Sequence, residues 1–340
     1  MKNLFIQILI VFSIFTAIQV HSQNNTIKWI KMQEALTLQK KTPKPIIIDV
    51  YTDWCGWCKV MDKNTFSDPN IISYINANYY AVKFDAEGSD TVIYKGQKYF
   101  PGQFNPQRPD KRYTHPFALL LTNNRPSYPT ITYLNDTAAL IAPMPGYKAP
   151  DKLQPELVFF AENLYKFINY EQFLTDFQKT FHDTTFVKPE ITWATVQEAM
   201  QLSLLSDKKL LIFLTVPWSM TGKIMEKVIF NNSVIAKKIN DNFTPVLFNA
   251  LSKDTLVFSN YTFVNEGKEH PFHQFAVMLL NGKMQFPAMI YMSSKFELIS
   301  AVPGYFDTRS VEPIISFFGT EAYKTKKYDE FIKTFTSDIK

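Results

Sequence analysis

The chain has 340 residues, of which 46% are hydrophobic and 20% are charged, a composition typical of folded globular proteins and long enough for about two domains. Its formal net charge is only +5, and the basic residues are scattered among the acidic ones. A nucleic-acid-binding protein is expected to carry a basic stripe, so the charge pattern argues against nucleic acid and favours protein partners.

The N-terminus reads MKNLFIQILIVFSIFTAIQVHSQ, in which one lysine precedes an apolar run from Leu4 to Val20. Because cleavage after Ser22 fits the small-residue rule, residues 1–22 are predicted to be a secretory signal peptide. The run is slightly longer than the ~7–15 residues of a typical signal core, so an uncleaved N-terminal anchor is the alternative. In both cases the rest of the chain is expected in the periplasm or another extracytoplasmic space. No later apolar run approaches the ~20 residues of a membrane span.

Strand and helix patterns alternate after the N-terminal segment. The run Pro45–Tyr51, PIIIDVY, is apolar and β-branched, which is typical of a strand buried on both faces. A helix is predicted from about Cys55, with apolar positions such as Met61 at helical spacing. The later elements are a strand in YYAVKFDAE, a hairpin in TVIYKGQKYF that turns at Lys95-Gly96, a helix in HPFALLL, strands in PTITYL and before Pro145, and a helix in LQPELVFFAENLY. This order predicts an α/β fold with a central mixed sheet.

The chain also repeats itself, and a long repeat indicates duplicated structural units. A shift of 164 residues places Trp29 on Trp193, Trp54 on Trp218, Lys59 on Lys223 and Phe84 on Phe248. After a net deletion of six residues the shift becomes 158, and HPFALLLTNNRPSYPTITYL lies over HQFAVMLLNGKMQFPAMIYM. We therefore predict two tandem domains of one fold, at 27–182 and 188–340, joined near Thr184–Pro189. Each contains the hairpin as an insertion.

The only two cysteines of the chain lie in the stretch YTDWCGWCK, at Cys55 and Cys58. A cysteine at a helix N-terminus meets unpaired backbone N–H groups and the positive end of the helix dipole, which favour the thiolate. Cys55 is therefore predicted to be the nucleophile, and Cys58, one turn further, to resolve the mixed disulfide that Cys55 forms. Asp49 points from the buried strand toward this site, and burial raises the pKa of a carboxyl group toward the range useful for proton transfer.

Two other uses of the cysteine pair remain as alternatives. Half of a zinc site is disfavoured, because zinc needs four ligands and the chain after the signal peptide adds only His115, His182, His270 and His273. No metal is predicted. A purely structural disulfide is also disfavoured, because closing so short a loop removes little entropy from the unfolded chain. For Asp49 the alternative is a buried carboxylate that accepts hydrogen bonds from backbone donors.

Asp49, the motif DWCGWCK and Tyr128-Pro129-Thr130 before a later strand together resemble thioredoxin-fold oxidoreductases. The resemblance covers both repeats apart from the hairpin. The pattern DWC-x-x-CK-x-M is similar to exported bacterial thioredoxin-like proteins and to the C-terminal domain of the membrane thiol:disulfide interchange reductase. It implies two tandem thioredoxin-like domains, each a central mixed β-sheet flanked by helices with an inserted hairpin.

The resemblance also implies roles for single residues. Asp49 would handle the proton of Cys58, and Pro129 would be the cis-proline that faces the dithiol, with an ordinary trans turn as the alternative. The backbone of Tyr128 would pair with an extended polypeptide substrate. Trp54, Gly56 and Trp57 are expected to frame the substrate, and Trp57 is the sharper candidate because Trp54 recurs in the second repeat and so favours a packing role.

The second repeat lacks the chemistry of the first. At the shift of 164, Cys55 becomes Ser219, Cys58 becomes Gly222 and Asp49 becomes Phe213. Without a thiol to serve, a buried carboxyl group only costs desolvation, so 188–340 is predicted to be a redox-inactive domain. It would position substrates, mediate dimerisation or stabilise the first domain. His115 and His273 share one repeat position, which favours a helix-start or packing role over a catalytic base.

The sequence thus predicts an exported thiol:disulfide oxidoreductase, and the resemblance of DWC-x-x-CK to the reductase side of the family implies that it reduces protein disulfides. No cofactor is expected apart from the redox-active disulfide Cys55–Cys58. Because the chain has no Gly-rich loop of the G-x-G-x-x-G type, a membrane thiol reductase is the expected electron donor. The alternative is a non-catalytic polypeptide-binding module or holdase built from two thioredoxin-like domains.

Overall fold

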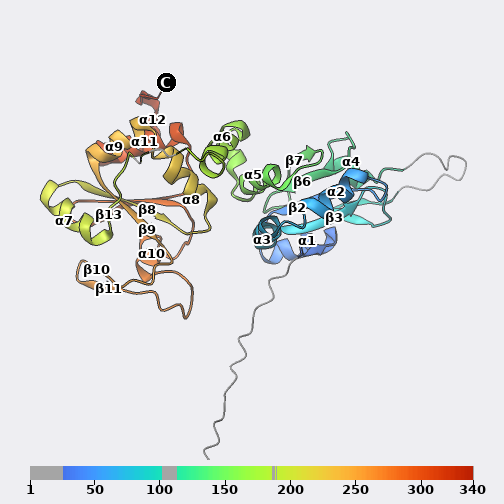
Figure 1. Ribbon diagram of the computed structural model, residues 1–340, viewed down its shortest axis with the longest axis horizontal. Coiled ribbons are helices and arrows are strands. Elements are labelled where there is room, and N and C mark those ends of the chain that lie inside the picture. Colours follow the sequence, from blue (N-terminus) through green and yellow to red (C-terminus); the bar gives the residue numbers. More distant parts are fainter. Residues whose placement is uncertain (1–25, 102–112, 186–187, 189, 340) are drawn as a thin grey trace, which may run out of the picture. The chain divides into compact units, whose positions relative to one another are not determined.

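The computed structural model describes residues 26–101, 113–185, 188 and 190–339 (Figure 1). The predicted signal peptide at 1–22 lies outside the described residues, as does part of the predicted junction near Thr184–Pro189. Within the described part of the chain, no helix is long and apolar enough to cross a membrane. The chain divides into two compact units, one ending at Pro150 and the other beginning at Asp151.

The first unit is built on a five-stranded sheet in the order β1-β3-β2-β6-β7. Its strands are β1 (Trp29–Ile30), β2 (Ile46–Tyr51), β3 (Tyr80–Asp85), β6 (Thr130–Leu134) and β7 (Leu140–Pro145). β3 runs parallel to β1 and β2, whereas β6 runs antiparallel to β2 and β7. The sheet is therefore mixed, as predicted, with the apolar strand β2 at its centre.

Helices cover both faces of this sheet. They are α1 (Met32–Lys41), α2 (Gly56–Asn64), α3 (Pro69–Asn78) and α4 (Pro116–Leu121). Side chains alternate along a strand, and Ile46, Ile48 and Val50 of β2 pack in one cluster with residues of α1 and α4. Asp49 consequently faces the opposite side, toward α2. The predicted hairpin is confirmed as β4 (Val92–Tyr94) and β5 (Gln97–Tyr99), and its turn residues Lys95 and Gly96 both have positive φ.

The second unit repeats this topology on a four-stranded sheet in the order β13-β12-β8-β9. Its strands are β8 (Lys209–Thr215), β9 (Phe243–Asn249), β12 (Ala288–Met292) and β13 (Leu298–Pro303), with the hairpin β10 (Leu256–Phe258) and β11 (Tyr261–Phe263). Its sheet is mixed, because β8 pairs parallel with β9 and antiparallel with β12. A single parallel bridge between Ala194 and Val246 lies where Ile30 pairs with Val82 in the first unit.

The helices of the second unit lie on both sides of its sheet, with α9 and α11 on one side and α10 on the other (Figure 1). Those that follow the predicted junction are α7 (Val196–Ser206), α8 (Met220–Ile224), the π-helical turn η2 (Met225–Ile229), α9 (Ser233–Asn242), α10 (Gln274–Leu279), α11 (Thr308–Gly319), the 3-10 turn η3 (Ala322–Lys324) and α12 (Tyr328–Thr334). Buried residues of α7, α10 and β8 form one core cluster, the counterpart of the cluster around α1, α4 and β2.

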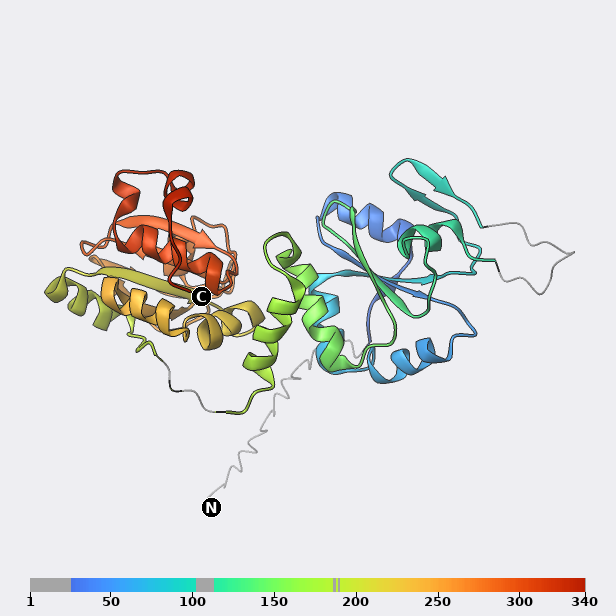
Figure 2. The ribbon, with the colours of Figure 1, turned by 90° about the horizontal axis from the view of Figure 1, so that it is seen from above.

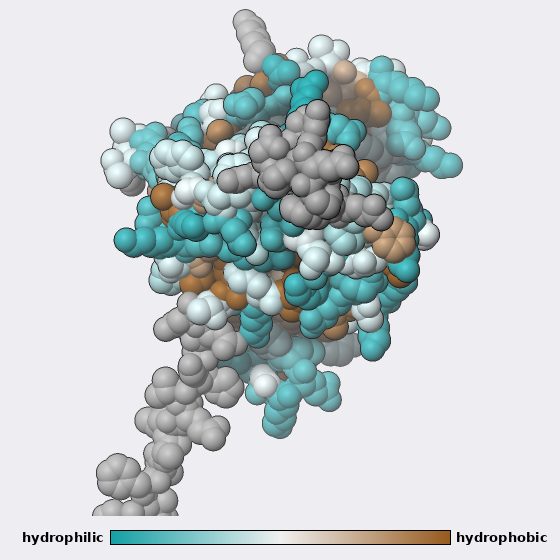
Figure 3. All heavy atoms as spheres, turned by 90° about the vertical axis from the view of Figure 1, so that its right-hand side faces the viewer, coloured by the Kyte–Doolittle hydropathy of each residue, from teal (hydrophilic) through white to brown (hydrophobic). Residues whose placement is uncertain are grey.

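The division between the units differs from the repeat boundary. Nearly all of α5 (Pro150–Ala161), together with the 3-10 turn η1 (Leu164–Lys166) and α6 (Tyr170–Phe181), groups with the second unit, although the repeat assigns these residues to the first. The domain bounds 27–182 and 188–340 therefore stay a prediction from sequence. In the face of the first unit seen in Figure 3, hydrophobic residues form separate spots among hydrophilic ones.

Candidate functional site

Cys55 and Cys58 are joined by a disulfide bond at the start of α2. Cys55 is the N-cap residue of this helix, and its sulfur accepts a hydrogen bond from the backbone N–H of Cys58 at 3.1 Å. The turn before the helix is closed by a hydrogen bond from Cys55 N to Thr52 O at 3.1 Å. The helix N-terminus thus directs N–H groups at Cys55, which stabilises a thiolate there once the disulfide is reduced. Both cysteines are buried.

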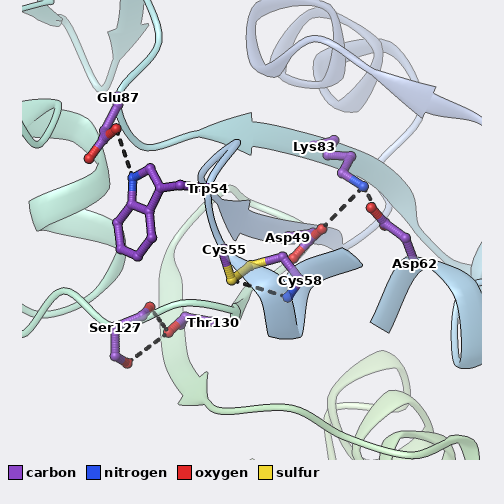
Figure 4. The surroundings of a disulfide bond; sticks show 9 residues. All are labelled: Asp49, Trp54, Cys55, Cys58, Asp62, Lys83, Glu87, Ser127 and Thr130. Carbon is purple, nitrogen blue, oxygen red and sulfur yellow. Dashed lines mark hydrogen bonds and ion pairs between the residues drawn. A yellow bond between two sulfur atoms is a disulfide. The ribbon is translucent and has the colours of Figure 1, made fainter. Parts of the chain in front are cut away.

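Asp49 lies buried in β2, between the disulfide and Lys83 in the view of Figure 4. Its desolvation raises its pKa to about 7, an effect that the Lys83 ammonium at 3.7 Å opposes and the Asp62 carboxylate reinforces. One carboxylate oxygen, Oδ1, has no hydrogen-bond partner, so the alternative of a carboxylate satisfied by backbone donors does not describe this oxygen. A carboxyl group that titrates near neutral pH can accept and return a proton.

Lys83 connects Asp49 to a second carboxylate that the sequence analysis did not single out. It forms an ion pair with Asp62 of α2 as well as with Asp49 (Figure 4). Its ammonium also lies over the rings of Tyr51, at 5.1 Å, and Trp29, at 5.7 Å. A signal was available in the sequence, because Lys83 is a charged residue between the apolar Val82 and Phe84 of β3, next to the strand that carries Asp49.

A tryptophan directly precedes each cysteine, and both are largely exposed, Trp54 at 51% and Trp57 at 62%. The indole N–H of Trp54 donates to Glu87 Oε2 at 2.9 Å (Figure 4), and its ring contacts the edge of Tyr128. Trp57 packs on Tyr147, with ring centroids 5.4 Å apart. That these tryptophans frame a substrate stays a prediction, and the sequence analysis missed Glu87 and Tyr147.

The peptide bond between Tyr128 and Pro129 is cis, as predicted. The turn before β6 is closed by a hydrogen bond from Thr130 Oγ1 to Ser127 O at 2.7 Å, and Figure 4 shows it on the same side of the disulfide as Trp54. The carbonyl of Pro129 accepts a hydrogen bond from Gly146 N at 2.8 Å. A Cβ added at Gly56 would meet no atom within 4 Å, so this position of the motif faces open space.

The second repeat keeps this backbone arrangement without the thiols. Ser219 caps α8 and accepts a hydrogen bond from Gly222 N at 3.0 Å, as Cys55 does from Cys58. The bond between Phe286 and Pro287 is also cis. A Cβ added at Gly222 would clash with Thr215 Oγ1, so the place of Cys58 is sterically filled. Phe213, at the position of Asp49, is fully buried.

His115 is the N-cap of α4, and its Nδ1 accepts a hydrogen bond from Phe117 N at 3.0 Å. Nε2 then carries the proton and donates to the carbonyl oxygen of Asp90 at 2.9 Å. His273 makes the same pair of contacts at the start of α10. The predicted helix-start role of His115 is confirmed. Among the residues that the structure describes, no group of three or more histidine, cysteine or carboxylate side chains is placed to hold a metal ion.

Comparison with known proteins bears on the first repeat. Residues 16–147 match the family model Thioredox_DsbH, described as a protein of unknown function, DUF255. Residues 16–147 belong to a thioredoxin-like family. The strand order, the cysteine pair at a helix start and the cis-proline of this thioredoxin-like region agree with that assignment.

Curated relatives carry the name thiol:disulfide interchange protein DsbD. The protein of that name from Vibrio vulnificus is 34% identical over 67 residues, which is 18% of this chain and 11% of that protein. The one from Pectobacterium atrosepticum is 44% identical over 36 residues, 11% of this chain and 6% of that protein. The chain thus spans about a tenth or less of the length of these relatives. The predicted relationship to the interchange reductase is confirmed.

Solved structures similar to the chain include two of related name. The structure titled "DsbH Oxidoreductase" is 17% identical, covering 41% of this chain and 86% of that chain, with a TM-score of 0.28. The oxidised DsbD C-terminal domain of Neisseria meningitidis is 18% identical, covering 35% of this chain and 84% of that chain, with a TM-score of 0.23.

Proposed function

We propose that this protein is an exported thiol:disulfide oxidoreductase that reduces protein disulfides through Cys55 and Cys58. The observation that carries the proposal is the disulfide at the N-cap of α2, placed beside a buried carboxyl group whose pKa is about 7. A helix N-terminus favours the attacking thiolate, and a carboxyl group titrating near pH 7 suits proton transfer at that pH. Thiol–disulfide exchange needs these two elements and no further cofactor.

The reaction begins from the dithiol form. The thiolate of Cys55 attacks one sulfur of the substrate disulfide, so that a bond between Cys55 Sγ and the substrate forms and the substrate's S–S bond breaks. The released substrate thiolate takes up a proton. Cys58 then loses its proton to Asp49 and attacks Cys55 Sγ, so that the Cys55–Cys58 disulfide forms and the bond between Cys55 Sγ and the substrate breaks. The second substrate sulfur leaves as a thiolate, which takes up the proton held by Asp49. The substrate gains two electrons, and the dithiol loses them.

The exposed rim of the site would hold the substrate. Gly56 leaves open space in front of the motif, and Trp54 and Trp57 offer large exposed rings on either side of Cys55. The Tyr128–Pro129 segment would pair through its backbone with an extended stretch of the substrate. We propose further that a membrane thiol reductase in an extracytoplasmic space returns the dithiol to its reduced form.

The test is the reduction potential of the Cys55–Cys58 couple in the purified protein, titrated against dithiothreitol or glutathione. We expect a value near the ~−270 mV of thioredoxin, whereas a value near ~−120 mV would make the protein an oxidant. In the same preparation, Cys55→Ser should abolish exchange with protein disulfides, and Cys58→Ser should accumulate mixed disulfides. A protein without a titratable couple, or one whose function survives Cys55→Ser, would instead be the non-catalytic polypeptide-binding module or holdase.

A further inference from the structure

The second unit buries two positions whose counterparts in the first unit are exposed, at Trp57, or half-buried, at Tyr147. Trp57 and Tyr147, which flank the redox site, correspond by repeat to Thr221 and Tyr305. Trp57 is 62% exposed, whereas Thr221 is 0% and Tyr305 only 7% exposed. The backbone framework around them is the same, since Ser219 caps α8 as Cys55 caps α2.

The covering residues come from α5, the turn after it and α6, all within the second unit. The hydroxyl of Thr221 donates a hydrogen bond to Glu162 Oε2 at 2.6 Å. The hydroxyl of Tyr305 donates to Asp176 Oδ2 at 3.5 Å, and its ring meets Phe173 edge-on with centroids 6.2 Å apart. A third contact is made by the side-chain amide of Gln154, which lies 3.9 Å from the sulfur of Met220, the counterpart of Gly56.

One face of α6 packs against the part of the second unit that contains α8 and Tyr305. Phe173, Asp176 and Phe177 are all buried, and they lie three or four residues apart, on one side of the helix. Farther along, Lys227 of η2 donates from its ammonium to the carbonyl of Thr180 at 3.1 Å. Figure 2 shows α5 and α6, in green, beside the yellow α8, and α6 packs on both α8 and η2.

Glu162 has no role in the redox site, and its side chain is half-buried. Burial raises its pKa to about 7, and its hydrogen bond from Thr221 opposes that rise. A carboxyl group is rarely buried without a partner that requires it. We therefore interpret the Glu162–Thr221 hydrogen bond as a specific attachment of the α5–α6 segment to the start of α8.

We propose that the α5–α6 segment is a built-in plug, occupying in the second unit the surface that corresponds to the substrate side of the first. The substrate side of the first unit then stays open to polypeptides, and the second unit serves to hold its own helical segment rather than to bind clients. The inference rests on the proposed function only in taking Trp57 and Tyr147 as part of the substrate surface.

The test compares how accessible a thiol at the N-cap of α2 and a thiol at the N-cap of α8 are to a polypeptide. Ser219→Cys is introduced into a chain carrying Cys55→Ser and Cys58→Ser, and the matched protein is Cys58→Ser, in which Cys55 is the only thiol. Each protein is treated with N-ethylmaleimide and with a short peptide that carries a maleimide. The rate with the peptide is divided by the rate with the small reagent, which cancels differences in thiol reactivity.

We expect this ratio to be roughly tenfold or more lower for the thiol at position 219 than for Cys55. A tenfold difference corresponds to a cost of ~1.4 kcal/mol for moving the α5–α6 segment away from the thiol. Adding Phe173→Ala or the nearly isosteric Thr221→Val should raise the ratio toward that of Cys55. The control is Phe331→Ala in α12, the repeat counterpart of Phe173, which should leave it unchanged.

Equal ratios at positions 219 and 55 would refute the proposal that the α5–α6 segment covers this surface. A low ratio at position 219 that neither Phe173→Ala nor Thr221→Val raises would also refute it. Thr221→Val decides the matter if Phe173→Ala fails to fold. The result does not depend on redox activity, because maleimide addition involves no disulfide. A missing Cys55–Cys58 couple would therefore reject the proposed function and leave this measurement intact.

Discussion

Asp49 of β2 pairs directly with Lys83 of β3, and the carboxylate and ammonium of the two side chains lie 3.7 Å apart. The same ammonium is in contact with Asp62 of α2. Lys83 therefore divides its charge between a buried carboxylate and one at the surface of the site. This arrangement links the proton affinity of Asp49 to one residue of β3 and one of α2.

The pH dependence of the resolving step, in which Cys58 attacks the mixed disulfide, should follow the protonation of Asp49. Burial raises its pKa to about 7, so the carboxylate that accepts the Cys58 proton is present above that pH and lost below it. We expect the rate of the resolving step to rise with pH through about 7. Asp49→Asn should remove this inflection and slow the step by roughly 10²-fold, the lower end for general-base catalysis. Stopped-flow kinetics of mixed-disulfide decay would measure it, with the exposed neighbour Asp53→Asn as control; an unchanged inflection in Asp49→Asn would refute the assignment.

The neighbours of Asp49 should shift this inflection in opposite directions. Lys83 lowers the pKa of Asp49, whereas Asp62 raises it. Lys83→Met is therefore expected to move the inflection to higher pH, and Asp62→Asn to lower pH. Carbon-detected NMR titration of the Asp49 carboxyl group would show both shifts. Shifts of the same sign in the two variants would contradict the charge division through Lys83.

Asp49 should also cost stability. Its folded pKa of about 7 exceeds its ordinary value of 3.8, so the folded protein binds the proton more tightly, and stability falls as pH rises from about 4 to about 7. Above pH 7 the charged carboxylate lowers the free energy of unfolding by at most ~4 kcal/mol, because the pKa differs by about three units and each unit corresponds to ~1.36 kcal/mol. We expect Asp49→Asn to be more stable than the wild type at pH 8 and similar at pH 4. Urea unfolding at the two pH values would test this; greater destabilisation of the variant at pH 8 than at pH 4 would contradict it.

The aromatic rim should determine substrate affinity. Tyr147→Ala removes the ring that packs on Trp57, and an aromatic contact contributes ~0.5–1.5 kcal/mol beyond its buried area. KM for a protein disulfide should rise by roughly 3- to 10-fold with the reduction potential unchanged. Trp218→Ala, which alters an exposed tryptophan of the second repeat, is the matched control. Equal effects of the two substitutions would show that the rim of the first repeat has no special role.

His115 should make the fold sensitive to acid. Burial lowers its pKa, and Nδ1 is unprotonated in the folded protein because it accepts the N–H of Phe117. The folded state thus prefers the neutral ring, so this stability is present above the ordinary pKa of about 6.5 and is lost as pH falls below it. Replacing the cap by His115→Ala should cost about 1 kcal/mol at pH 8, with His115→Asn costing less. Thermal unfolding at several pH values would measure this. If Tm of His115→Ala falls between pH 7 and 5 with the same slope as Tm of the wild type, His115 is not the source of the acid sensitivity.

Features that depend on neighbours in the chain could be predicted from the sequence alone. The run PIIIDVY forms β2, the hairpin turns at Lys95-Gly96, and Cys55 caps a helix that brings Cys58 back to it. The repeat similarly indicated that Ser219 and Gly222 keep the framework of the site without its thiols. Local backbone preferences and the spacing of side chains on one helix turn or one strand determine all of these.

Contacts between distant segments were decided by the tertiary structure. Lys83 reaches Asp49 because two strands pair in one register, and Tyr147 meets Trp57 because the loop after β7 lies beside α2. The grouping of α5 and α6 with the second unit also went against the repeat boundary. Sequence similarity records which segments were duplicated, whereas the packing of a helix depends on which surface buries its apolar face, and that surface exists only after the chain has folded.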